Sequence, residues 1–354
     1  MHGEDLRAHP GGRVGVARVG RTMKTAAPTL ARMLGSWQLD PGVLVVCAAA
    51  ATLYGWGVVR AHRSPRGHWP LWRVASFMAG LLVLMCALLS GIDPYSDELL
   101  SIHIVQHLLL ILLAPVLLLW GAPVRLALSV SAPAGRRAIG AVLRRRWVRV
   151  LTRPACGFAL FTLVVLATHM TGLYEVALRD QPVHDFEHAA YFWSGIVFLL
   201  PLLAADPVPS PPSAITRFSW LMAAMTVMFI PAALLMFDEH VRYPFYLAPA
   251  RALHRSALAD QHAAGIAMAV GGGVAMAALA IVVAMEAMIR EERRQRRRDT
   301  YLYPERPAGG TQAERSAARA GAGAARASGP VLAGETVPTR GTTIVEARGE
   351  SAGA

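Results

Sequence analysis

The sequence has few acidic residues and very few cysteines. Asp and Glu number 23 against 35 Lys and Arg, which leaves a formal net charge of +12. The three cysteines, Cys47, Cys86 and Cys156, lie within or at the edge of apolar runs, and no two of them have the C-x-x-C spacing. We therefore interpret each cysteine as a small buried apolar residue rather than a metal ligand.

The chain also lacks the H-E-x-x-H motif, because Ile104 follows His103 and Asp185 follows His184. An intramembrane hydrolase that uses a metal-bound water is therefore a minor alternative, and we expect the protein not to be an enzyme. No RNA- or DNA-binding motif accompanies the basic charge. We expect that charge to face a lipid bilayer and not nucleic acid.

Long apolar runs are what the sequence does contain. Hydrophobic residues make up 54% of the chain, above the roughly 45–50% of a soluble domain. About 20 mostly uncharged residues span a bilayer core, and continuous runs of that kind predict helices rather than barrel strands. The seven predicted spans are Pro41 to Val59, Val74 to Ser90, Leu100 to Trp120, Ala155 to Thr171, Phe186 to Ala204, Phe218 to Phe237 and His262 to Met288. We predict an all-α, polytopic membrane protein with seven transmembrane helices in one bundle.

The arginines predict how the bundle is oriented. They concentrate in the segments 60–73, 125–153 and 290–298, whereas segment 91–99 carries Asp93, Asp97 and Glu98 and no basic residue. The positive-inside rule places the three basic segments in the cytoplasm. We therefore expect a multi-pass protein of the bacterial plasma membrane with a cytoplasmic C-terminus.

Three regions follow from this reading. Residues 1–36 form a basic tail that would lie outside, against the rule, so we expect translation to start at Met33. Residues 37–290 form the seven-helix membrane domain. Residues 291–354 are rich in Arg, Ala and Gly and are expected to be a disordered cytoplasmic tail.

Histidines gather at the predicted outer ends of four helices. Two pairs have the H-x-x-x-H spacing, which stacks both rings on one helix face and can chelate one metal ion. Ionisable groups in membrane helices usually face the bundle interior or a wet cavity. The candidate metal ligands are His103, His107, His169, His184, His188 and His262. Acidic and amide neighbours, including Gln106, Glu187 and Asp260, are placed to orient such ligands.

The residue types favour copper as the metal without establishing it. Imidazole suits copper, zinc, iron and nickel, and the thioethers of Met222, Met225 and Met228 on the sixth span favour Cu(I), although methionine also simply packs membrane helices. Paired imidazoles beside water would let a bound ion exchange with a partner. Two alternatives stay open, a b-type haem with axial histidines and a copper transporter.

Several separated motifs resemble the CtaG family of multi-span assembly factors for caa-type cytochrome c oxidase. They are the runs Trp37 to Pro41, His103 to His107 leading to Leu112 to Pro123, Thr168 to Tyr174, His184 to His188 followed by Phe192-Trp193, and Asp260 to Gly265. The resemblance covers roughly Trp37 to Arg290. It departs from the family pattern at His262, which follows a glutamine where we would expect a different residue.

This resemblance implies a membrane assembly factor for a haem–copper cytochrome c oxidase. Its expected partners are oxidase subunits and the lipid bilayer. The implied activity is the binding and delivery of copper through the outer histidines. The alternative function is a b-type haem-binding membrane protein that acts in electron transfer or haem delivery.

Overall fold

The structure is a computed structural model that describes residues 28–64 and 68–302, with side chains to residue 298. All regular elements in these ranges are helices, and the only strand-like pairing among them is the isolated bridge between Trp37 and Ser90. The prediction of an all-α membrane protein is confirmed. The proposed start at Met33 concerns residues 1–32, of which residues 1–27 lie outside the described ranges. Most of the predicted disordered tail, residues 303–354, also lies outside them.

Six described helical segments are long and apolar enough to cross a membrane, or seven if one bent pair counts as a single span. The long single helices are α2 (Pro41–His62), α3 (Leu71–Leu89), α12 (Gln181–Leu203), α13 (Ala214–Phe237) and α15 (Ala257–Leu302). The predicted third span lies within a run made of α5 (Leu100–Leu108), η1 (Leu109–Leu113), α6 (Ala114–Trp120) and α7 (Pro123–Val130). The bent pair corresponds to the predicted fourth span.

That bent pair is α10 (Pro154–Met170) and α11 (Leu173–Arg179), which meet at an angle of 75°. Seventeen residues of α10 rise about 26 Å, slightly less than the bilayer core of about 30 Å. The side chain of Thr171 accepts a hydrogen bond from the backbone N–H of Leu173, which starts the new helix after the extended backbone of Thr171. The sequence analysis did not anticipate α11.

The third span contains a π-helical segment, η1, directly after His107. Pro115 has no N–H, so the carbonyl of Ile111 loses its usual α-helical donor. Gly195 of α12 packs against that same carbonyl, where a Cβ atom would lie 2.1 Å from its oxygen. The wider turn and the close glycine contact together bring α5 and α12 together beside the histidines.

Helix α15 continues past the predicted end of its span at Met288 and reaches Leu302. The predicted domain boundary at residue 290 therefore falls inside a helix. Arg and Glu are good helix formers, and pairs four residues apart support the extension, namely Arg290 with Glu286 and Arg296 with Glu292. The apolar pattern marks where a span can end but does not mark where a helix ends.

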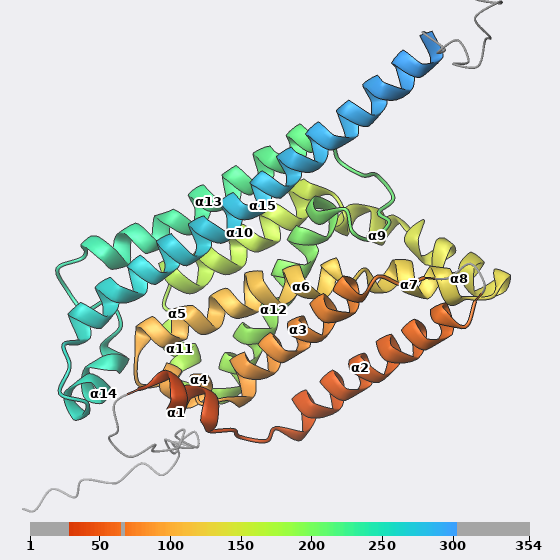
Figure 1. Cartoon of the computed structure of the whole chain (residues 1–354). Coiled ribbons are helices and arrows are strands. Elements are labelled where there is room, and N and C mark those ends of the chain that lie inside the picture. Colours follow the sequence, from red (N-terminus) through yellow and green to blue (C-terminus); the bar gives the residue numbers. More distant parts are fainter. Residues whose placement is uncertain (1–27, 65–67, 303–354) are drawn as a thin grey trace, which may run out of the picture. The chain divides into compact units, whose positions relative to one another are not determined.

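Short helices close both ends of the bundle formed by residues 28–291 (Figure 1). One end carries α1 (Leu30–Gly35), α4 (Ile92–Ser96), α11 and α14 (Leu247–Ala252), and the other carries α7, α8 (Pro133–Leu143) and α9 (Arg146–Leu151). The arginines of segment 125–153 are exposed at the second end. The main buried cluster is built by α5, η1, α6, α10, α12, α13 and α15, whereas α2 packs mainly on α3 and α7.

Candidate metal centre

The first turns of α5 bury two imidazoles. His103 and His107 are 0% and 2% exposed, and their Nε2 atoms lie 2.9 Å apart. Asp260 at the start of α15 accepts hydrogen bonds from the backbone N–H and the hydroxyl of Ser101, which fixes where α5 begins. Gln106 donates to the carbonyl of Ala87 in α3. These contacts together fix the rotation of α5 about its own axis, so that its two histidines face α12.

Helix α12 presents three more side chains to the same space. Its N-cap is Asp180, which accepts from the backbone N–H of Val183, and the next turn carries His184, Glu187 and His188 on one face. All three are buried. The ring of His103 lies 5.2 Å from that of His184 and 6.0 Å from that of His188, measured between centroids. The two helices thus bring together imidazoles from positions about 80 residues apart in the sequence.

Two overlapping sets of donor atoms result. In the first set, the donor atoms belong to His103, His184 and His188 and lie within 4.8 Å of one another. In the second set, the donor atoms belong to His103, His107 and Glu187 and are equally close. Donors about 2.1 Å from a tetrahedral ion are about 3.4 Å apart, so small side-chain movements suffice to coordinate a metal. His103 is common to both sets.

Glu187 is the strongest sign that a cation fits here. Its carboxylate is 3% exposed, and neither of its oxygens has a hydrogen-bond partner among the described residues. The nearest basic nitrogen is Nε2 of His107, 4.0 Å from Oε2. Burying an ionised carboxylate without a partner is costly in a membrane protein, and a bound cation removes that cost. The donor set of imidazoles and one carboxylate fits a divalent or monovalent transition metal.

Tyrosines surround the cluster. The Tyr246 hydroxyl lies 3.0 Å from Nδ1 of His103 and donates to the carbonyl of Ser96 at 2.9 Å. Burial raises the pKa of Tyr246, which lies outside the spans, well above its ordinary value, so its hydroxyl stays a neutral donor. Tyr191 stacks on His107 with ring centroids 3.9 Å apart, and Tyr174 packs 5.0 Å from His103.

The model of the cytochrome c oxidase caa3 assembly factor family matches residues 52–290, which include every residue of this cluster. The chain belongs to this family. The resemblance seen in the sequence is confirmed.

Curated relatives of this chain are longer proteins. It is 28% identical over 282 residues to uncharacterised proteins of Mycobacterium bovis and Mycobacterium tuberculosis, and 26% identical over 278 residues to one of Mycobacterium leprae. These matches cover 77%, 77% and 76% of this chain and 41% of each relative, so the chain spans less than half of their length. No solved structure matches the chain.

Four of the six predicted metal ligands enter the two donor sets, and two do not. His169 is buried, with Nδ1 3.0 Å from the carbonyl of Val165 and 3.3 Å from the Tyr191 hydroxyl, and it joins neither donor set. Nε2 of His262 lies 3.0 Å from the carbonyl of Asp238 in the loop after α13. Spacing on single helices predicted the two pairs, but it could not show which way the lone histidines turn.

The expectation that the histidines lie beside water is wrong. Side chains of the short helices and loops at this end cover the rings, and His103, His107, His184 and His188 are all 6% exposed or less. Tyr174 and Tyr246, which contact His103, come from α11 and from η2 (Pro244–Tyr246). Aromatic residues of these short segments therefore cover the site.

From the sequence, Glu187 is only a neighbour of the candidate ligands, and the tyrosines are not among the candidate site residues. A signal for Glu187 was present, because His184, Glu187 and His188 have the H-x-x-E-H spacing that one class of zinc-binding helices uses. No local pattern marks Tyr246, whose contact with His103 joins residues 143 apart.

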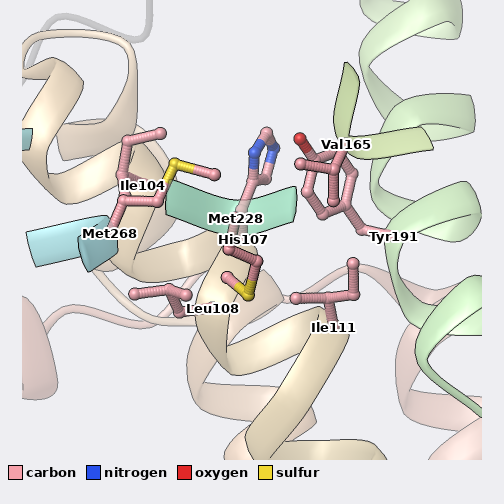
Figure 2. A pocket seen from close by; sticks show the side chains of 8 residues that line it. All are labelled: Ile104, His107, Leu108, Ile111, Val165, Tyr191, Met228 and Met268. Atoms are coloured by element: carbon pink, nitrogen blue, oxygen red, sulfur yellow. The ribbon is translucent and has the colours of Figure 1, made fainter. Parts of the chain in front are cut away.

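Methionine does reach the cluster, although by fewer residues than the sequence suggested. Met228 of α13 and Met268 of α15 line a small pocket beside His107, whereas Met225 is 41% exposed. Figure 2 shows one sulfur atom on the side of the His107 ring opposite Tyr191, and the other lower in the pocket, beside Leu108. Gly272 permits this packing, because a Cβ there would lie 2.6 Å from the terminal methyl of Met228.

Proposed function

We propose that this assembly factor binds copper through His103, His107, His184, His188 and Glu187 and passes it to a subunit of a caa3-type oxidase during assembly. The observation that carries the proposal is the convergence of four buried imidazoles around a buried carboxylate that has no hydrogen-bond donor. Structural packing alone gives no reason to bury such a carboxylate within a bundle of apolar helices.

Three properties of the site favour copper over other metals. Imidazole binds copper well, and copper stands at the top of the affinity order for divalent first-row ions. Met228 and Met268 line the same small pocket as His107, and soft sulfur favours Cu(I). The family role supplies a use for the metal, because the oxidase that the family helps to assemble is a haem–copper enzyme.

The geometry supports haem and hydrolysis less well. The Nε2 atoms of His103 and His107 are 2.9 Å apart, so no porphyrin plane fits between them as it does between two axial histidines. The pocket described beside His107 is small and lined mainly by apolar side chains, which offers little to hold a polar substrate. Binding and delivery, without catalysis, therefore account best for the site.

The orientation of the protein is part of the proposal. The histidine cluster and the arginine-rich segment 125–153 lie at opposite ends of the bundle of residues 28–291 (Figure 1). The positive-inside rule then places the histidines at the outer face of a bacterial plasma membrane and the C-terminus in the cytoplasm. Reporter fusions at the loop after α3 and at the C-terminus test this, and a reporter active outside the cell at the C-terminus would refute it.

Metal analysis of the purified protein tests the copper proposal. We expect wild type and His262→Ala, a histidine at the same end but outside the cluster, to bind copper. His103→Ala and His107→Ala should lose most of it and should lower oxidase activity in membranes of the producing cell. Equal copper in all four proteins, or none in wild type, would refute the proposal. A Soret absorbance band in wild type that disappears in His103→Ala would support haem instead.

A further inference from the structure

The two donor sets of the cluster share one residue. His103 belongs both to the set with His184 and His188 and to the set with His107 and Glu187. Two ions could occupy both sets at once only if His103 offered one nitrogen to each. The hydrogen bonds of His103 decide whether both of its ring nitrogens can bind a metal.

The contacts of Tyr246 fix the tautomer of His103. The Tyr246 hydroxyl has one proton, and it donates this proton to the carbonyl of Ser96, which can only accept. The hydroxyl oxygen must therefore accept from Nδ1 of His103, 3.0 Å away, so Nδ1 carries the ring proton. Nε2 is then the unprotonated nitrogen that can bind a metal, an arrangement that metal-binding histidines commonly show.

The donor sets also differ in chemistry. The set with His184 and His188 offers neutral imidazoles alone, whereas the set with His107 and Glu187 adds a buried carboxylate. A carboxylate is a hard, negatively charged ligand, and its attraction to an ion of charge +2 is twice its attraction to one of charge +1 at the same distance. The low dielectric around a residue that is 3% exposed strengthens this difference.

We infer that the protein binds one copper ion at a time in two overlapping positions that share Nε2 of His103, with Cu(I) among His103, His184 and His188 and Cu(II) among His103, His107 and Glu187. The inference rests on the proposed function, because it specifies how the same site holds copper. It makes Tyr246 a positioning residue that acts on both forms through the shared ligand. The same ion can then change ligands without leaving the cluster.

Copper titrations of the full chain in detergent test the inference, with Cu(I) under reducing, oxygen-free conditions and Cu(II) in air, each against a competing chelator. We expect one ion per chain in either state. Glu187→Gln should weaken Cu(II) binding at least tenfold and Cu(I) binding less than threefold, and His188→Ala should do the reverse. Tyr246→Phe should weaken both by about 10- to 100-fold, the usual effect of losing such a partner. His262→Ala is the matched control and should change neither.

Electron paramagnetic resonance of the Cu(II) form adds a readout that misfolding cannot imitate. Two coupled nitrogens are expected in wild type and three in Glu187→Gln, where the ion can use only the imidazole set. His188→Gln replaces His188→Ala if the alanine variant does not fold. Two ions bound together, or equal effects of Glu187→Gln and His188→Ala in both oxidation states, would overturn the inference while leaving copper binding intact. A wild type that binds no copper in either state would instead overturn the proposed function.

Discussion

Replacing Gly195 with alanine should both destabilise the protein and weaken its copper binding. A Cβ at this position would lie 2.1 Å from the carbonyl oxygen of Ile111 in η1. Carbon and oxygen rarely approach closer than about 3.3 Å, so α12 and η1 must separate locally by roughly 1.2 Å. The contacting atoms are backbone atoms of two helices, which cannot move aside as a flexible side chain does.

The expected size of the effect follows from this geometry. Overpacking of a tight site costs about 1–3 kcal/mol, and the better helix propensity of alanine returns only about 0.5–1 kcal/mol. A domain of this size should lose several degrees in Tm, at about 2–4 °C per kcal/mol. Gly195 lies seven residues after His188 on α12. Because metal–ligand distances tolerate about 0.2 Å, a shift of roughly 1.2 Å should also reduce copper affinity.

Thermal unfolding in detergent and a copper titration on the same samples measure both effects. Gly273→Ala is the matched control, since a Cβ there meets nothing within 4 Å, and it should keep or slightly raise the Tm. If Gly195→Ala has the same Tm as Gly273→Ala and the copper affinity of wild type, then the close contact of α12 with η1 does not hold the cluster together.

Two further predictions concern other contacts. Asp206→Ala should lower the free energy of unfolding by about 0.5–2 kcal/mol, because Asp206 accepts hydrogen bonds from the backbone N–H groups of Val124 and Arg125 at the start of α7. Asp206→Asn keeps an acceptor oxygen and should recover part of this loss. Thermal unfolding measures both variants. Glu286→Ala should lower the Tm more than Glu292→Ala does. Glu286 neutralises the guanidinium of Arg217 in α13, which is 2% exposed, whereas Glu292 pairs with the exposed Arg296. Equal Tm values for the two variants would contradict this.

Apolar runs predicted the spans because a bilayer imposes one length on every helix that crosses it. The predicted fourth span, Ala155 to Thr171, differs from α10 by one residue at each end. Ends were predicted less well where charge continues a helix, as in α15 beyond Met288. A Lys- or Arg-rich segment can be helical in water, so hydropathy carries no information about it.

The candidate site was only partly predictable for a related reason. Spacing on one helix predicted the pairs His103–His107 and His184–His188, because residues four apart always share a face. Which helices face one another depends on long-range packing, such as the contact of Gly195 with Ile111, and no local pattern encodes it. The direction of His262 and the part played by Tyr246 both depend on loops, whose course the sequence does not reveal.

The sharp turn between α10 and α11 has a consequence for timing. It places Tyr174, which is fully buried, against His103, so the rings are sealed from the solvent at that side. An ion held among them leaves only when this covering segment moves, and such local openings are slow compared with diffusion. Under the proposed function, the residence time of the ion as well as its affinity then decides when the ion is released.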